Sequence, residues 1–128
     1  MDHNPSINDV LFMHAALVKE YGGASGVRDA GSLDAAVARP WGASFGQEHF
    51  PTPFDKAAAI CEAIIKRHPF VNGNKRTGSS AGSYLLEALG YRVRVKKGEV
   101  AKFALAVAND EMTFEEISDW FGENSEKI

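Results

Sequence analysis

The chain has 128 residues, of which 45% are hydrophobic and 24% charged, and its net charge is −3. These values are typical of one globular domain that buries a core without disulfides or metals. They give no reason to expect a nucleic-acid partner, and no apolar run approaches the roughly 20 residues that span a bilayer, so no membrane contact is expected. A single cysteine and the absence of a signal-peptide pattern favour a cytoplasmic setting.

The first half of the chain predicts two helices followed by a structured loop. Asn4-Pro5 can open a helix because the missing N–H of proline costs little at that position. Apolar residues then recur at helical spacing until Gly22 ends the helix. A short helix is expected over residues 32–39. Residues 41–53 combine glycine, proline and aromatic residues, which favours a hairpin or structured loop over a flexible linker.

Two long helices are expected next, over residues 54–67 and 75–89, joined by the loop 68–74. The first of them carries apolar residues along one face. The second contains Gly78 and Gly82, and a glycine inside a helix costs about 1 kcal/mol relative to alanine. Two such glycines indicate close approach by another helix, so we place this helix at the centre of the bundle.

The last third of the chain predicts an extended segment and two more helices. Residues 91–95 alternate apolar and basic side chains, as in a short edge strand. A helix is expected over residues 100–108, and a capping box beginning at Thr113 opens the last helix. The expected fold is therefore all-α, with a single helical domain over residues 1–122 and a polar, frayed tail over residues 123–128.

The stretch HPFVNGNKRTG, residues 68–78, holds the side chains best suited to chemistry. The start of a helix offers unpaired N–H groups and the positive end of the helix dipole, which together bind phosphate. Gly73 allows the backbone to approach an anion closely, while Lys75 and Arg76 place positive charge where a helix alone would disfavour it. His68 is suited to accept a proton from a hydroxyl near neutral pH.

Each of these signals is weak when taken alone. A single histidine at a helix end is most often a cap or a solvated residue, a Lys-Arg pair is usually a solvated face, and Asn-Gly is usually a turn. Their occurrence together in one short stretch is much harder to attribute to chance. Asn72 adds either a side-chain oxygen for a metal ion such as Mg²⁺ or a side-chain amide for phosphate.

This stretch resembles the signature of the Fic/Doc family, roughly H-x-F-x-[D/E]-G-N-[G/K]-R. The matching positions are His68, Phe70, Gly73, Asn74, Arg76 and, as in the Doc branch, Lys75. A second stretch, GVRDAGSL over residues 26–33, resembles the first half of death-on-curing proteins, so the likeness covers most of the chain. The resemblance implies a helical core that cradles the loop between two central helices, with residues 41–53 as a flap beside it.

The resemblance also implies roles for individual residues. His68 would be the general base that acts on a hydroxyl of a target protein. The residues expected to hold the phosphates of ATP, or of another nucleoside triphosphate, are Gly73, Asn74, Lys75, Arg76 and Lys66. Asn72 stands where the family usually has Asp or Glu to help hold Mg²⁺, so weaker metal binding is expected.

Three of the candidate residues leave an alternative open. Phe45 and Phe50 in the flap would contact the target, which the family lays alongside by strand pairing, or they would serve as simple hydrophobic cover. Lys66, next to the helix end, would add to phosphate binding or remain a solvated residue.

Lys75 stands where nucleotidyl-transferring relatives carry glycine. In Doc-type proteins this lysine goes with transfer of the γ-phosphate, which implies a toxin kinase that phosphorylates a Thr or Ser of a target such as elongation factor Tu and inhibits translation. The alternatives are nucleotidyl transfer (AMPylation or a similar reaction), a binding module made inactive by Asn72, and a structural helical domain in which the motif is coincidence. No internal inhibitory motif is evident, so the expected regulator is a cognate antitoxin.

Overall fold

The computed structural model describes residues 5–128, which form six α-helices, one 3₁₀ helix and two short antiparallel sheets. The α-helices are α1 (Ile7–Tyr21), α2 (Ala30–Ala38), α3 (Pro53–Arg67), α4 (Asn74–Ala88), α5 (Glu99–Ala108) and α6 (Phe114–Glu123). The strands are β1 (Ala43–Ser44), β2 (Gln47–Glu48), β3 (Tyr91–Val93) and β4 (Ser125–Lys127), and the 3₁₀ helix is Arg39–Trp41. The expected helical bundle with a hairpin flap is confirmed.

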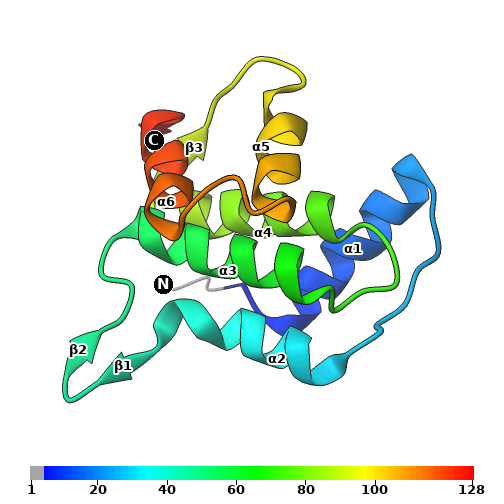
Figure 1. The fold of residues 1–128 in the computed structure, drawn as a ribbon, viewed down its shortest axis with the longest axis horizontal. Coiled ribbons are helices and arrows are strands. Elements are labelled where there is room, and N and C mark those ends of the chain that lie inside the picture. The colour runs from blue at the N-terminus through cyan, green and yellow to red at the C-terminus, as the bar shows by residue number, and fades with distance from the viewer. Residues whose placement is uncertain (1–4) are drawn as a thin grey trace.

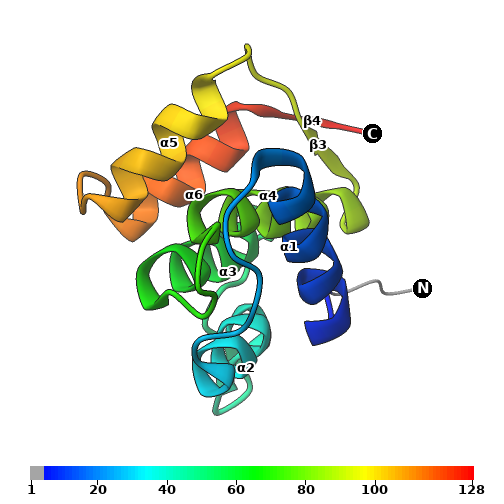
Figure 2. The same cartoon turned by 90° about the vertical axis from the view of Figure 1, so that its right-hand side faces the viewer.

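Helices α3 and α4 lie side by side at the centre of the molecule (Figure 1). In this view α2 lies below them and α5 and α6 above, while Figure 2 shows that α1 packs on the far side of α4. Nine of the residues of α3 are buried, including Ile60, Ile64 and Ile65, so this helix forms the middle of the core. No helix of the described residues is long and apolar enough to cross a lipid bilayer.

The two glycines of α4 explain how closely the central helices approach one another. A Cβ atom on Gly78 would stand 2.6 Å from Cγ1 of Ile65 and 3.0 Å from the carbonyl oxygen of Cys61, both on α3. A Cβ atom on Gly82 would stand 2.7 Å from the ring of Phe121 and 3.1 Å from the carbonyl oxygen of Ala57. Any larger residue would push the helices apart, which confirms the central place expected for α4.

Side-chain caps fix where the helices begin. Ser6 caps α1 in a capping box with Asp9, whereas the expected contribution of Asn4 lies outside the described residues. Asp29 caps α2 by accepting a hydrogen bond from the Ser32 N–H at 3.0 Å, so this helix starts two residues earlier than the sequence predicted. The same bond is the main reason that the pKa of the Asp29 carboxyl lies below its usual value.

The expected frayed tail is wrong. Residues Ser125–Lys127 form β4, which pairs antiparallel with β3 so that Tyr91 faces Lys127 and Val93 faces Ser125. An ion pair between Arg94 and Glu126 lies beside this ladder. The N–H of Ile128 also bonds to the carbonyl of Gly90, so residues 125–128 are held to the body of the fold.

Candidate functional site

His68 lies at the junction between the two central helices. It follows directly after α3 and adopts the left-handed conformation, with φ 51° and ψ 58°, which ends the helix and turns the chain into the loop 69–73. Its Nδ1 atom lies 3.5 Å from the side-chain nitrogen of Asn74, the first residue of α4. The imidazole is therefore beside the start of α4, as the sequence predicted, although a contact of this length is too weak to fix which ring nitrogen carries the proton.

Asn74 has a different task from the one expected of it. Its side-chain oxygen accepts a hydrogen bond from the Phe70 N–H and its side-chain nitrogen donates one to the Phe70 carbonyl, each at 3.0 Å. The residue is buried, so these two bonds satisfy backbone groups that water does not reach. Asn74 thus fastens the loop to α4, and its amide is already engaged rather than directed at a phosphate.

A cleft of about 510 Å³ opens at the start of α4. Gly73, Lys75 and Arg76 line it together with residues of α1 and α5, and Ser79 and Ser80 line it one turn further along α4. The cationic first turn and Gly73, whose φ of +76° is a conformation that glycine adopts without strain, therefore face one cavity. His68 does not line this cleft. It contacts Asn74, and Asn74 lines the edge of the cleft.

Arg76 is held in this cleft by an aromatic ring. Its guanidinium carbon lies 4.3 Å from the centre of the Tyr21 ring, at the end of α1. Arginine stacked on an aromatic face keeps its N–H donors free at the edge of the group. Arg76 is thus oriented before any anion arrives.

The segment that connects α1 to α2 is hydrogen-bonded to the loop 69–73. The Val71 N–H donates to the carbonyl of Gly26 at 3.0 Å, and Val27 and Phe70 form an isolated antiparallel bridge. The Ala24 N–H donates to the side-chain oxygen of Asn72 at 2.8 Å. Asn72 therefore turns its oxygen toward this segment, so that atom already has a partner.

His14 of α1 supports the loop from the other side. Its buried ring stacks on Phe70, with ring centres 3.8 Å apart and an angle of 8° between the planes. Its Nε2 atom lies 2.8 Å from the carbonyl oxygen of Asn72, to which it donates. The sequence did not indicate this role of His14, because the spacing of helical positions does not show which of them meets a loop 58 residues away.

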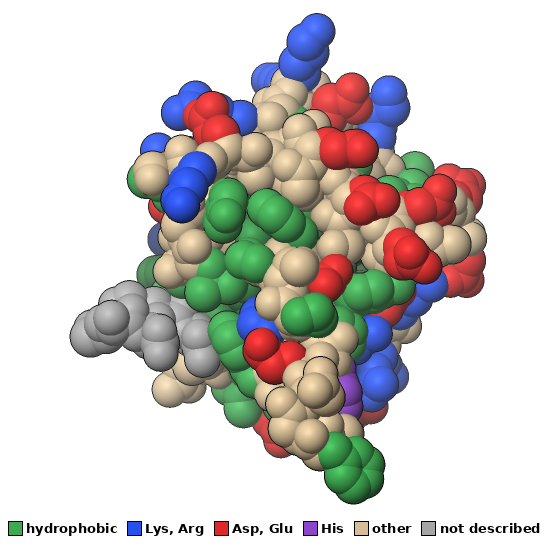
Figure 3. Space-filling view, turned by 90° about the vertical axis from the view of Figure 1, so that its left-hand side faces the viewer, with side chains coloured by type: hydrophobic (Ala, Val, Ile, Leu, Met, Phe, Trp, Pro, Cys, Tyr) green, Lys and Arg blue, Asp and Glu red, His purple; other side chains and the backbone are tan. Residues whose placement is uncertain are grey.

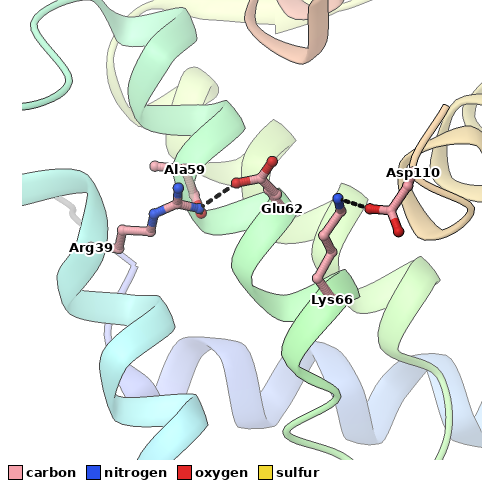
Figure 4. Close-up of polar contacts among 5 residues, drawn as sticks. All are labelled: Arg39, Ala59, Glu62, Lys66 and Asp110. Carbon is pink, nitrogen blue, oxygen red and sulfur yellow. Dashed lines mark hydrogen bonds and ion pairs between the residues drawn. The ribbon is translucent and has the colours of Figure 1, made fainter. Parts of the chain in front are cut away.

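Lys66 lies on another face of α3. Its ammonium group forms an ion pair with Asp110, in the connection after α5, as Figure 4 shows. The same figure shows Arg39 paired with Glu62 one turn earlier, at 2.9 Å. Lys66 is thus committed to a structural contact and does not line the cleft. This ion pair differs from both alternatives that the sequence left open, phosphate binding and a solvated residue.

The flap hairpin separates the two phenylalanines that the sequence offered as target contacts. Phe45 stands at the tip, fully exposed and with a positive φ of 52°. Phe50 lies at the base, where its ring centre is 5.3 Å from that of Phe114 and 5.2 Å from the guanidinium of Arg39. Phe50 is therefore hydrophobic cover at the base of the hairpin, whereas the ring of Phe45 is exposed to solvent at its tip. Figure 3, seen from the side on which the hairpin projects, shows further hydrophobic side chains exposed on this face.

The described residues contain no group of three or more His, Cys, Asp or Glu side chains that could hold a metal ion. Asn72 is the single metal ligand that the sequence suggested, and its side-chain oxygen accepts a hydrogen bond from the Ala24 N–H. These residues do not fit a resident Mg²⁺ ion, which proteins usually bind through carboxylates.

The chain matches the model of one protein family, described as the Fic/DOC family, over residues 4–86. It is similar to the protein named Toxin Doc of Mycolicibacterium smegmatis, with 42% identity over 73 residues, which is 57% of this chain and 56% of that protein. It is also similar to the Protein kinase doc of Escherichia phage P1, with 26% identity over 114 residues and 89% of each chain covered. The match to the mycobacterial toxin thus spans little more than half of that relative, whereas the match to the phage kinase is nearly full length.

Proposed function

Since the chain belongs to the Fic/DOC family, we propose that it is a Doc-type toxin that transfers the γ-phosphate of ATP to a hydroxyl group of a target protein. The observation that carries this proposal is the place of the His68 ring beside Asn74, at the start of the helix whose first turn presents Lys75 and Arg76 to a cleft. The names of the two relatives, a toxin and a protein kinase, support it.

In the proposed reaction His68 removes the proton from a Ser or Thr hydroxyl of the target. The hydroxyl oxygen then attacks the γ-phosphorus of ATP, the bond from that phosphorus to the bridging oxygen breaks, and ADP leaves with the electron pair of that bond. Phosphoryl transfer depends on positioning and on charge neutralisation more than on covalent chemistry of the enzyme. Lys75, Arg76 and the amides at the start of α4 supply that positive charge.

The proposed substrate is ATP as its Mg²⁺ complex. Asn72 lacks the negative charge that an acidic residue would give. The ion would therefore be bound by the phosphates of the nucleotide and enter the site with them. This proposal predicts that Asn72→Asp lowers the Mg²⁺ concentration needed for half-maximal activity, provided that the new carboxylate turns away from Ala24.

The proposed setting is the cytoplasm, where elongation factor Tu is our candidate target and a cognate antitoxin is the proposed regulator. The relative named as a toxin supports the antitoxin, because such proteins must be neutralised in their own cells. We expect growth arrest when the chain is produced without that partner, and normal growth with His68→Ala.

The proposal is tested by incubating the protein and elongation factor Tu with ATP labelled at the γ-phosphate or, in a parallel reaction, at the α-phosphate. We expect label on the target from the first nucleotide and none from the second, with His68→Ala abolishing the signal. Arg92→Ala, which changes an exposed arginine of β3 away from the cleft, serves as the control substitution outside the site.

A second function is favoured by one observation, the engagement of the Asn72 oxygen by Ala24. A chain without a metal-binding carboxylate could bind nucleotide or protein and catalyse nothing. Label on the target from the α-phosphate would identify a nucleotidyltransferase instead, and label from neither nucleotide would identify the binding module.

A further inference from the structure

The backbone of His68 needs external support. It is one of three non-glycine residues with a positive φ among the described residues, the others being Phe45 and Asp110. The left-handed region is strained for such residues, and it persists only where the surroundings enforce it. Because the direction of the Cα–Cβ bond follows from this backbone conformation, whatever enforces it also aims the imidazole.

Arg28 supplies that support from the segment between α1 and α2. Its Nε donates to the carbonyl of His68 and its Nη2 to the carbonyl of Arg67, both at 2.7 Å. The last carbonyls of a helix have no partner within the helix, and a cation is favourable at that end of the helix dipole. The planar guanidinium fork spans two consecutive carbonyls, which a lysine ammonium cannot reproduce with the same geometry.

The backbone around Arg28 fixes the next peptide group as well. The N–H groups of Arg28 and Asp29 both donate to the carbonyl of Pro69, at 2.7 and 3.0 Å. Three consecutive carbonyls, from Arg67 to Pro69, are therefore held by one dipeptide. This leaves the peptide groups on both sides of His68 without freedom to rotate.

We propose that Arg28 is a positioning residue for His68: its guanidinium locks the left-handed turn that directs the imidazole toward the start of α4. Arg28 does not line the cleft and takes no part in the chemistry. The kinetic consequence rests on the proposed function, whereas the effect on the ring of His68 does not.

The test compares Arg28→Ala and Arg28→Lys with the unaltered protein. Histidine ring signals are recorded by NMR on protein with labelled histidine, and the signal of residue 68 among the four histidines is assigned with His68→Ala. We expect Arg28→Ala to move this signal and to speed amide exchange in the loop. We expect kcat to fall about 100-fold, as for a misplaced catalytic group, with the KM for ATP unchanged.

Two further measurements separate positioning from general damage to the fold. Millimolar guanidinium ion added to Arg28→Ala should restore both the ring signal and kcat, and Arg28→Lys should recover part of each. Asp29→Ala is the matched control, because it removes the cap of α2 and lowers stability but keeps the Arg28 fork. Its ring signal and kcat should match those of the unaltered protein.

The proposal is overturned if Arg28→Ala keeps the His68 signal and kcat of the unaltered protein, or if Asp29→Ala shifts them equally. If the unaltered protein transfers no phosphate, the proposed function fails and the ring signal alone decides on Arg28. If Arg28→Ala does not fold, the decision passes to Arg28→Lys, whose unchanged ring signal would overturn the proposal.

Discussion

The loop 69–73 and the flap hairpin 43–48 are both short connections, but they are held in different ways. The loop is fastened on three sides, by Asn74 of α4, by His14 of α1 and by the segment 24–29. The hairpin pairs through only two residues on each strand, and its tip at Phe45 is fully exposed. The loop is therefore held by contacts with three other segments, whereas the tip of the hairpin projects into solvent.

The hairpin is anchored at its base by a buried lysine. Lys56 of α3 is 6% exposed, and its ammonium group bonds to the carboxylate of Glu48 at 2.7 Å and to the carbonyl of Phe50. It also lies 5.1 Å from the centre of the Trp41 ring. The flap thus has a rigid base and a free tip, while the loop has no free part.

The largest effect is expected from Asn74→Ala, which removes both bonds to the buried backbone of Phe70. Leaving these two groups without partners should lower the free energy of unfolding by about 2 kcal/mol or more, as measured by urea denaturation. Asn124→Ala, which removes one bond to the Trp120 carbonyl, is the matched control and should cost less. An equal or smaller loss in Asn74→Ala would mean that the loop does not depend on this residue.

A smaller loss is expected from His14→Phe. This change keeps an aromatic ring on Phe70 and removes only the bond to the Asn72 carbonyl, so the free energy of unfolding should fall by about 1 kcal/mol. The free energy of unfolding of His14→Ala should fall further, because the stacking on Phe70 is lost as well. If the two variants are equally stable, the ring contact contributes nothing and the hydrogen bond is the whole support.

Lys56→Met should loosen the hairpin while leaving the global stability nearly unchanged. Methionine keeps the apolar contacts of the lysine stem, and the partner carboxylate of Glu48 is exposed, so water hydrates its charge once the ammonium group is gone. Cleavage by chymotrypsin after Phe45 should nevertheless become several-fold faster. Glu48→Gln changes the exposed partner of this pair and should have a weaker effect. Unchanged cleavage in Lys56→Met would show that the hairpin is held by something else.

The smallest effect on stability is expected from Phe45→Ala, since the ring makes no buried contact. The free energy of unfolding should change by less than about 0.5 kcal/mol. If the flap receives the target, the KM for the target protein should rise while the KM for ATP stays constant. Phe50→Ala is the contrasting variant, because it removes packing on Phe114 and should lower stability. A KM for the target that does not respond to Phe45→Ala would remove the flap tip from target binding.

The sequence predicted the elements whose signals are local. Helical spacing and helix-terminus signals identified the six helices, the glycines of α4 identified the central helix, and the signature singled out His68 in the connection before that helix. The matching stretch 26–33 was noticed as a resemblance, but its physical role was not, because Arg28 meets its carbonyl partners 39 and 40 residues away. Spacing along a chain does not reveal which distant carbonyl a guanidinium will reach.

The predictions for Lys66 and for the tail 123–128 were wrong for the same reason: the partners of these residues lie far away in the sequence. Lys66 appeared suited to phosphate because it flanks His68 in sequence, but a helix turns neighbouring side chains to different faces, and its partner Asp110 lies in the connection after α5. The tail over residues 123–128 looked frayed because it is polar, yet a strand at a sheet edge needs backbone partners rather than apolar side chains. The tail pairs with β3 because α6 ends next to that strand, and the local composition of the tail does not show where α6 ends in space.

The proposed phosphoryl transfer requires that His68 and the basic start of α4 serve the same nucleotide, although His68 does not itself line the cleft. An NMR titration with a non-hydrolysable ATP analogue tests this directly, by following the ring of His68 and the amides of residues 73–76 in one sample. We expect both sets of signals to shift with one dissociation constant. Shifts of the α4 amides with an unchanged His68 ring would contradict the account, because the phosphates would then bind out of reach of the proposed base.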